Sequence, residues 1–302
     1  MSFWAVTSYF NPVRYNTRLM NYKIFRKNLQ VPLLTIEISA DGNFDLTSDD
    51  ADILIQISGG AVLWQRQRLL NVALKSVPAK ADKIAWLDCD IIFNRSDWVD
   101  YAEAELRKNC IIQLCSDAVL LSPGEDSKAT GINSHYETRV GIVKKCLNGD
   151  LDIIANSRGT RVDFTMLAWA ARREIIEKIG FYDAAIVGGG DMFFLAAIYG
   201  KTQFPIDRFS INPLFKKHYL DWANRIPESV INKVGYIDCE LSHLWHGETK
   251  DRNRDARWKI LEDFDPYEDV VVSQSGAWEF TSIGERLEAP IKNFFISRRE
   301  DG

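Results

Sequence analysis

Strand-like and helix-like segments alternate along the first 120 residues, and this alternation constrains the fold more than any other feature of the chain. Residues with β-forming side chains fill segment 3–10, which ends at an Asn-Pro turn, and apolar side chains at helical spacing follow across 14–30. The alternation continues with predicted strands at 31–38, 52–57, 84–87 and 111–121 and predicted helices at 62–75 and 97–108. This pattern predicts an α/β fold with a mostly parallel sheet covered by helices on both faces. Ligands of such sheets bind at the carboxyl ends of the strands.

Charge and cysteine content narrow the classes of function. The chain has 37 basic and 42 acidic residues, so it lacks the basic field that a nucleic-acid-binding protein needs. No apolar run approaches the ~18 residues of a membrane helix, and the amino terminus does not have the pattern of a signal peptide. The five cysteines are scattered without CxxC spacing, which predicts a reducing compartment and no zinc–thiolate site. We therefore expect a cytoplasmic protein without a membrane span and without a nucleic-acid partner.

A pair of aspartates, Asp88 and Asp90, directly follows the predicted strand at 84–87. Carboxylates at a strand end can offer hard oxygen ligands to a divalent cation. Three other Asp-x-Asp pairs occur in the chain, but only this one lies between two apolar runs, where unpaired charge is costly. The pair therefore indicates a metal or nucleotide site. The alternative is a solvated strand end at which the aspartates act as caps.

Three consecutive glycines, 188–190, precede Asp191 and a predicted helix that ends at Gly200. Glycines permit positive φ and close approach of a ligand. A carboxylate in this position can reach a bound substrate, which would suit a catalytic base. The alternative is a helix cap after a flexible turn, where the helix dipole favours an acid.

Two of the four histidines, His243 and His246, lie three residues apart. Such a pair can place both imidazoles on one side of a turn, a usual arrangement of metal ligands. The alternative is a structural role for each ring.

An aromatic and a basic residue, Trp64 and Arg66, lie near the start of the predicted helix at 62–75. Their side chains could stack on a base and bind phosphate. The alternative is a solvated basic face with a half-buried tryptophan.

Taken in order, these four motifs resemble the GT-A glycosyltransferases, in particular the β-1,4-galactosyltransferases and the transferase domains of bacterial chondroitin polymerases. Residues 64–72 match the family's aromatic-x-Arg-x-basic-Leu-Leu-Asn-Val element, and Asp88 with Asp90 match its DxD motif. Asp191 aligns with the last acid of the family's Trp-Gly-Gly-Glu-Asp segment, and His246 with its histidine ligand. The chain departs from the family at Gly190, where the family has glutamate.

The resemblance implies transfer of a sugar from a nucleotide-diphosphate donor, a UDP-sugar, to a hydroxyl of a carbohydrate or other acceptor, with inversion and with Asp191 as general base. It implies a Mn²⁺ ion, with Mg²⁺ as the alternative, held by Asp88, Asp90 and His246, and with His243 as a weaker candidate ligand. Mixed oxygen and imidazole ligation suits manganese better than magnesium. The residues implied to bind the nucleotide-sugar are Thr7, Tyr9, Trp64, Arg66, Asp88, Gly189 and Gly190.

The same resemblance implies one GT-A domain over residues 1–249. Its nucleotide-binding half would span 1–120 and its acceptor-binding half 121–249. Residues 250–302 would form a C-terminal extension packed on that domain.

Two other classes of function use similar features. A nucleotidyltransferase acting on sugar phosphates also needs paired carboxylates and a nucleotide, although segment 7–12 lacks the glycine-rich basic loop that usually binds a triphosphate. It would release pyrophosphate. A non-catalytic sugar-binding module of the same fold would not hydrolyse the donor in the absence of an acceptor.

Overall fold

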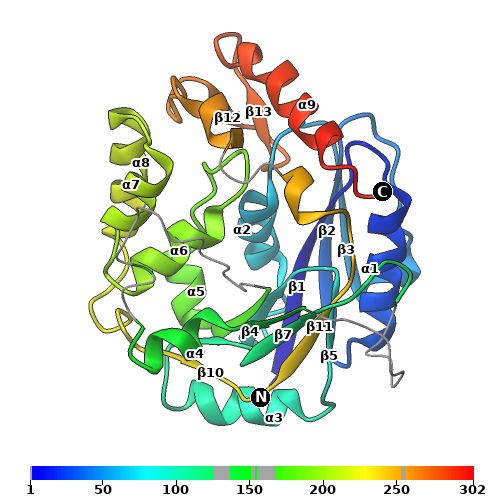
Figure 1. Ribbon diagram of the computed structural model, residues 1–302, viewed down its shortest axis with the longest axis vertical. Coiled ribbons are helices and arrows are strands. Elements are labelled where there is room, and N and C mark those ends of the chain that lie inside the picture. Colours follow the sequence, from blue (N-terminus) through cyan, green and yellow to red (C-terminus); the bar gives the residue numbers. More distant parts are fainter. Residues whose placement is uncertain (1, 126–136, 151–153, 155–166, 253–255) are drawn as a thin grey trace.

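A seven-stranded sheet forms the centre of the computed structural model, which describes residues 2–125, 137–150, 154, 167–252 and 256–302 (Figure 1). Four neighbouring strand pairs in this sheet are parallel, and only β9 runs antiparallel to both of its neighbours. The strand order is β10 (Val234–Tyr236), β6 (Ile111–Gln113), β9 (Ala168–Arg172), β4 (Ala81–Leu87), β1 (Ser2–Phe10), β2 (Leu33–Ser39) and β3 (Ile53–Ser58). The predicted fold class, α/β with a mostly parallel mixed sheet flanked by helices, is confirmed.

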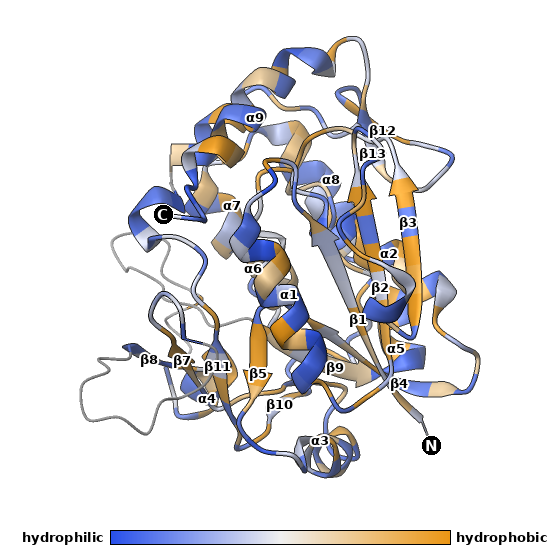
Figure 2. Cartoon of the chain, turned by 90° about the vertical axis from the view of Figure 1, so that its right-hand side faces the viewer, coloured by the Kyte–Doolittle hydropathy of each residue, from blue (hydrophilic) through white to orange (hydrophobic). Residues whose placement is uncertain are grey.

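Helices cover both faces of this sheet because its central strands, β1 and β4, are buried along nearly their whole length. In Figure 2 the orange of hydrophobic residues also runs along much of the neighbouring strands β2 and β3. On one face, Phe3 and Ala5 of β1 pack in the same cluster as residues of α1 and α3. On the other face, Trp4 and Val6 pack with residues of α2, α5 and α6. The α-helices of the described segments are α1 (Asn16–Asn28), α2 (Arg66–Ser76), α3 (Trp98–Leu106), α4 (Ile142–Leu147), α5 (Arg173–Ile179), α6 (Gly190–Ile198), α7 (Gln203–Phe209), α8 (Pro213–Ala223) and α9 (Glu288–Ser297).

A second, four-stranded sheet brings two distant segments of the chain together. Its order is β5 (Ile91–Phe93), β11 (Glu240–His243), β7 (Asp117–Leu120) and β8 (Glu137–Val140). β11 pairs antiparallel with β5, so that His243 lies opposite Ile91. The backbone N–H of Leu244 then donates to the carbonyl of Asp90 at 2.8 Å. This register places the histidine segment beside the aspartate pair.

The predicted single strand at 111–121 is wrong. The chain instead forms β6 in the seven-stranded sheet and β7 in the four-stranded sheet, with a change of direction at residues 114–116 between them. The predicted helix at 62–75 begins later, at Arg66. The preceding backbone bonds to another segment of the chain instead of to its own helix: the Trp64 N–H donates to the Ile186 carbonyl at 2.8 Å.

The C-terminal residues pack against the face of the sheet that carries α2. Trp258, Trp278 and Phe295 belong to the same buried cluster as the central strands. The side chain of Gln65 accepts from the Trp278 N–H at 2.7 Å and donates to its carbonyl at 3.2 Å. These residues form 3₁₀ turns, α9 and a two-stranded sheet of β12 (Val270–Val272) and β13 (Trp278–Phe280). In Figure 1 the chain ends beside α1.

Within the described segments, no helix has both the length and the apolar character needed to cross a bilayer.

Candidate active site

A cavity of about 280 Å³ opens where β1 and β4 end. All four sequence motifs contribute side chains to its walls, as expected if ligands bind at the carboxyl ends of the strands. The predicted site residues that line it are Trp64, Arg66, Asp88, Asp90, Gly189, Asp191, His243 and His246.

One wall of the cavity carries three side chains suited to a metal ion, which we call the metal wall: Asp90, His243 and His246. One ligand atom from each lies within 4.8 Å of the others. Nε2 of His246 is 3.3 Å from Oδ2 of Asp90, and Nε2 of His243 is 3.7 Å from Oδ1. That Oδ1 atom is buried without a hydrogen bond. A buried carboxylate oxygen and two imidazoles facing it fit a divalent cation, because each can donate a lone pair.

Asp88, predicted as a third ligand, lies outside this group. Its Oδ1 forms an ion pair with Nη2 of Arg66 at 2.6 Å. Burial raises the pKa of Asp88 well above its ordinary value; Arg66 opposes this shift, and the charges of Asp90 and Asp191 add to it. Such crowding of carboxylates favours a bound cation nearby.

A second group of side chains, which we call the base wall, consists of Asp191, which lines the same cavity, and the two residues that hold it, Arg66 and Gln67. Oδ1 of Asp191 accepts from Nη1 of Arg66 at 2.7 Å and from Nε2 of Gln67 at 3.0 Å. The helix-cap interpretation does not describe this carboxylate: the N-cap of α6 is Gly189, and Asp191 lies in the first turn. Arg66 therefore links Asp88, next to the metal wall, to Asp191.

The glycine turn before Asp191 allows this close packing. Gly188 and Gly189 have φ of 91° and 92°, which residues with a side chain rarely adopt. A Cβ on Gly190 would lie 2.6 Å from Cδ of Gln67, so α6 could not approach α2 so closely with a larger residue there. A glutamate at position 190, as in the glycosyltransferases that the sequence resembles, would therefore clash with the Gln67 side chain.

Three predicted nucleotide-binding residues do not line this cavity: Thr7, Tyr9 and Gly190. The Thr7 hydroxyl is buried and donates to the Leu87 carbonyl at 2.7 Å. Ser8 and Phe10 line the cavity instead, because successive side chains of a strand point to opposite faces. Tyr9 lines a second cavity of about 200 Å³ and donates to Asp45 at 2.8 Å.

Trp64 forms an aromatic boundary of the cavity. Its ring stacks on Phe295 of α9, with centroids 6.1 Å apart and planes 7° from parallel. The Arg298 guanidinium lies 5.0 Å from the centre of the same ring. The predicted contact of Trp64 with a ligand stays a prediction, but its position at the cavity suits one.

Several lining residues were missed by sequence reasoning, namely Arg18, Arg208, Arg252, Arg257, Phe295 and Arg298. Among these, only Arg252 lies in a segment that stands out in the sequence, the charged run at 250–255. Its Nη2 lies 3.1 Å from Nε2 of His246. The others come from segments with no chemical motif, so only their packing brings them to the site.

Comparison with known proteins gives matches only among solved structures: no family model and no curated protein matches the chain. Glucosyl-3-phosphoglycerate synthase from Mycobacterium tuberculosis, solved with Mn²⁺, UDP-glucose and phosphoglyceric acid, is 9% identical over 93% of this chain and 86% of that one, with a TM-score of 0.42. TarS 1-349 from S. aureus, solved with UDP-GlcNAc, is 14% identical over 87% of this chain, with a TM-score of 0.37. A putative nucleotide-diphospho-sugar transferase from Desulfovibrio desulfuricans G20 is 11% identical over 97% of this chain and 99% of that one, with a TM-score of 0.36.

One of these titles names a putative nucleotide-diphospho-sugar transferase, and the other two name UDP-GlcNAc and UDP-glucose as molecules present in the crystals. The chain spans 66% of that TarS structure and 39% of a longer one.

Proposed function

We propose that the chain is a metal-dependent glycosyltransferase that moves a sugar from a nucleotide-diphosphate donor, a UDP-sugar, to an acceptor hydroxyl with inversion. One observation carries the proposal. The metal wall and the Asp191 carboxylate line the same cavity, and Arg66 connects the two sides through ion pairs of 2.6 Å to Asp88 and 2.7 Å to Asp191. A site with a cation on one side and a base on the other suits transfer between a charged leaving group and a neutral hydroxyl.

Asp90 and His246 would hold the cation, with His243 close enough to join them. A divalent cation bound there would stabilise the negative charge that develops on the leaving diphosphate. One carboxylate oxygen and two imidazole nitrogens suit Mn²⁺ better than Mg²⁺, which prefers oxygen ligands. Asp88 and Arg66 would contact the donor beside the cation, since their paired side chains line the cavity next to Asp90.

Asp191 would take the proton of the acceptor hydroxyl. Its side chain is 32% exposed, so an acceptor can reach it, and its two hydrogen bonds fix its direction. A positioned base of this kind contributes roughly 10²–10⁴-fold to a rate. One carboxylate that can take the acceptor proton suits direct displacement with inversion.

The donor nucleotide would extend from the metal wall toward the second cavity. Phe10 lines both cavities, so they are neighbours along the end of β1. Tyr9 would then contact the nucleoside in the second cavity, and Trp64 would pack against the sugar in the first.

The five cysteines carry free thiols, which suits the reducing conditions of the cytoplasm, where we place the enzyme.

A donor screen tests the proposal. The protein is incubated with Mn²⁺ and each of a panel of nucleotide-sugars, and free nucleoside diphosphate is measured with and without candidate hydroxyl acceptors. We expect slow hydrolysis of one UDP-sugar, accelerated by an acceptor. Release of pyrophosphate from a nucleoside triphosphate and a sugar phosphate would instead identify a nucleotidyltransferase. Binding of a sugar without turnover of any donor would identify a binding module.

A further inference from the structure

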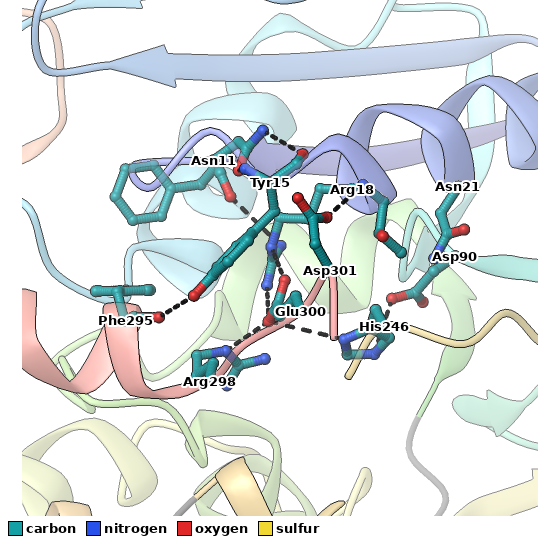
Figure 3. A network of polar contacts seen from close by, with 12 residues as sticks. Asn11, Tyr15, Arg18, Asn21, Asp90, His246, Phe295, Arg298, Glu300 and Asp301 are labelled. Atoms are coloured by element: carbon teal, nitrogen blue, oxygen red, sulfur yellow. Dashed lines mark hydrogen bonds and ion pairs between the residues drawn. The ribbon is translucent and has the colours of Figure 1, made fainter. Parts of the chain in front are cut away.

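The last residues of the chain, 298–302, lie between α1 and the metal wall (Figure 3). The Asp301 carboxylate accepts the backbone N–H groups of Asn16 at 3.0 Å and Thr17 at 2.8 Å. These N–H groups belong to the first turn of α1, which has no side-chain cap of its own. The Tyr15 hydroxyl donates to the Ile296 carbonyl at 2.9 Å. The segment is thus attached to the start of α1 by several bonds.

Glu300, within this segment, is the most completely enclosed carboxylate beside the cavity. Its side chain is 1% exposed. It accepts from Nη2 of Arg18 at 2.9 Å and from Nε of Arg298 at 2.5 Å, and Nε of Arg18 contacts its other oxygen. These bonds to two arginines fix the position of the carboxylate and favour its ionised form.

The oxygen that accepts from both arginines, Oε1, also faces His246. It lies 3.7 Å from Nδ1 of the imidazole, which is buried and makes no hydrogen bond among the described residues. On the far side of the ring, Nε2 faces Asp90 and lies 3.1 Å from Nη2 of Arg252. Because an arginine can only donate, Nε2 accepts there and the proton lies on Nδ1, toward Glu300.

The residue after His246 permits this contact. Gly247 has a φ of 82°, and a Cβ there would lie 2.9 Å from the carbonyl of Arg299 and 3.0 Å from that of Arg298. The backbone of the last segment therefore crosses directly over the glycine. A larger residue would push Glu300 away from the imidazole.

We propose that Glu300 is a positioning residue for the metal site: it holds His246 as the Nδ1–H tautomer with Nε2 toward Asp90, so that the Nε2 lone pair, which accepts from Arg252 in this structure, is available to a cation that displaces that bond. The inference rests on the proposed metal-dependent function. A carboxylate that accepts the second N–H of a metal-binding histidine fixes the ring and raises its basicity as a ligand, and its loss typically lowers metal affinity ~10–100-fold.

Calorimetric titration with Mn²⁺ tests this role. We expect Glu300→Gln to weaken Mn²⁺ binding ~10–100-fold. The matched control is Asp301→Asn, which removes a charge from the adjacent position but one that faces α1; we expect its Mn²⁺ affinity to stay within about twofold of wild type, since it leaves the histidine contact intact. In a His246→Ala background, Glu300→Gln should have no further effect. Wild-type affinity in a folded Glu300→Gln protein would overturn the proposal.

A second measurement reads the tautomer in the wild-type protein, so it does not depend on the folding of Glu300→Gln. Long-range proton–nitrogen NMR of the four histidine rings, with His246 assigned by its loss in His246→Ala, should show a proton on Nδ1. A proton on Nε2 would overturn the proposal, as would a wild type that binds no Mn²⁺. If Mn²⁺ binding depends on Glu300 while no donor is turned over, the positioning role stands and the proposed transferase function fails.

Discussion

The two walls of the cavity differ in how they hold their functional groups. On the metal wall, the side chains of His243 and His246 are each 9% exposed, and strand pairing and the final segment of the chain fix their positions. On the base wall, the Asp191 side chain is 32% exposed and held by two side chains of α2. A buried wall suits a small ion that stays in place, whereas an accessible carboxylate suits a substrate that comes and goes. The difference indicates that binding and proton transfer can be disrupted separately.

The largest effect is expected on the metal wall, from Asp90→Asn. The amide keeps the shape of the side chain but loses the charge opposite a dication, so Mn²⁺-dependent turnover should disappear. Mn²⁺ affinity should fall by more than the ~10–100-fold that the loss of a supporting partner costs. Circular dichroism should show an unchanged fold. Asp263→Asn, an exposed member of another Asp-x-Asp pair, is the matched control. Unchanged turnover together with unchanged affinity would reject the metal assignment.

The corresponding change on the base wall, Asp191→Asn, should separate chemistry from binding. We expect kcat to fall by at least ~10²-fold because the proton acceptor is lost, while donor and Mn²⁺ affinity stay near wild type. Single-turnover rates, donor affinity and Tm measured on one preparation provide the check. A normal single-turnover rate would show that Asp191 only supports the start of α6.

The two histidines allow a comparison within the metal wall. His246→Ala should weaken Mn²⁺ binding more than His243→Ala, because Nε2 of His246 lies 3.3 Å from Asp90 and that of His243 lies 3.7 Å away. Calorimetric titration of both variants measures the difference. Equal losses would mean that both rings coordinate equally, and a larger loss at His243 would reverse the assignment.

The smallest expected effect is a pH dependence of metal binding. Because the pKa of Asp88 is raised in the metal-free protein, this carboxyl carries a proton over part of the weakly acidic range. A cation beside it favours the ionised form, so binding releases the proton and apparent Mn²⁺ affinity should rise with pH, by at most about tenfold per pH unit for one proton. Titrations between pH 5.5 and 8 check this. Asp88→Asn should flatten the slope; an equal slope in that variant would assign the proton to another group.

The parts of the site that sequence analysis identified are those whose geometry is local. Asp88 and Asp90 follow β4 directly, so their place at the end of the sheet follows from the strand itself. Asp191 follows a glycine turn and begins a helix, and this too depends only on neighbouring residues. Thr7 and Tyr9 show the limit of such reasoning. β1 is buried on both faces, so its pattern does not reveal which alternate set faces the ligand, and the cavity is lined by Ser8 and Phe10.

By itself, the sequence determined most of the strand and helix order up to about residue 108, the α/β class and the candidate chemistry, because hydrophobic periodicity and short motifs act over a few residues. Tertiary structure decided which of these groups meet. The pairing of β11 with β5 brought His243 toward Asp90 and left Asp88 with Arg66. The contact between Arg18 and Glu300 joins residues 282 positions apart, and no local pattern encodes it. Such contacts arise only when the whole core packs, since burial of distant apolar faces is what brings the end of the chain to the metal wall.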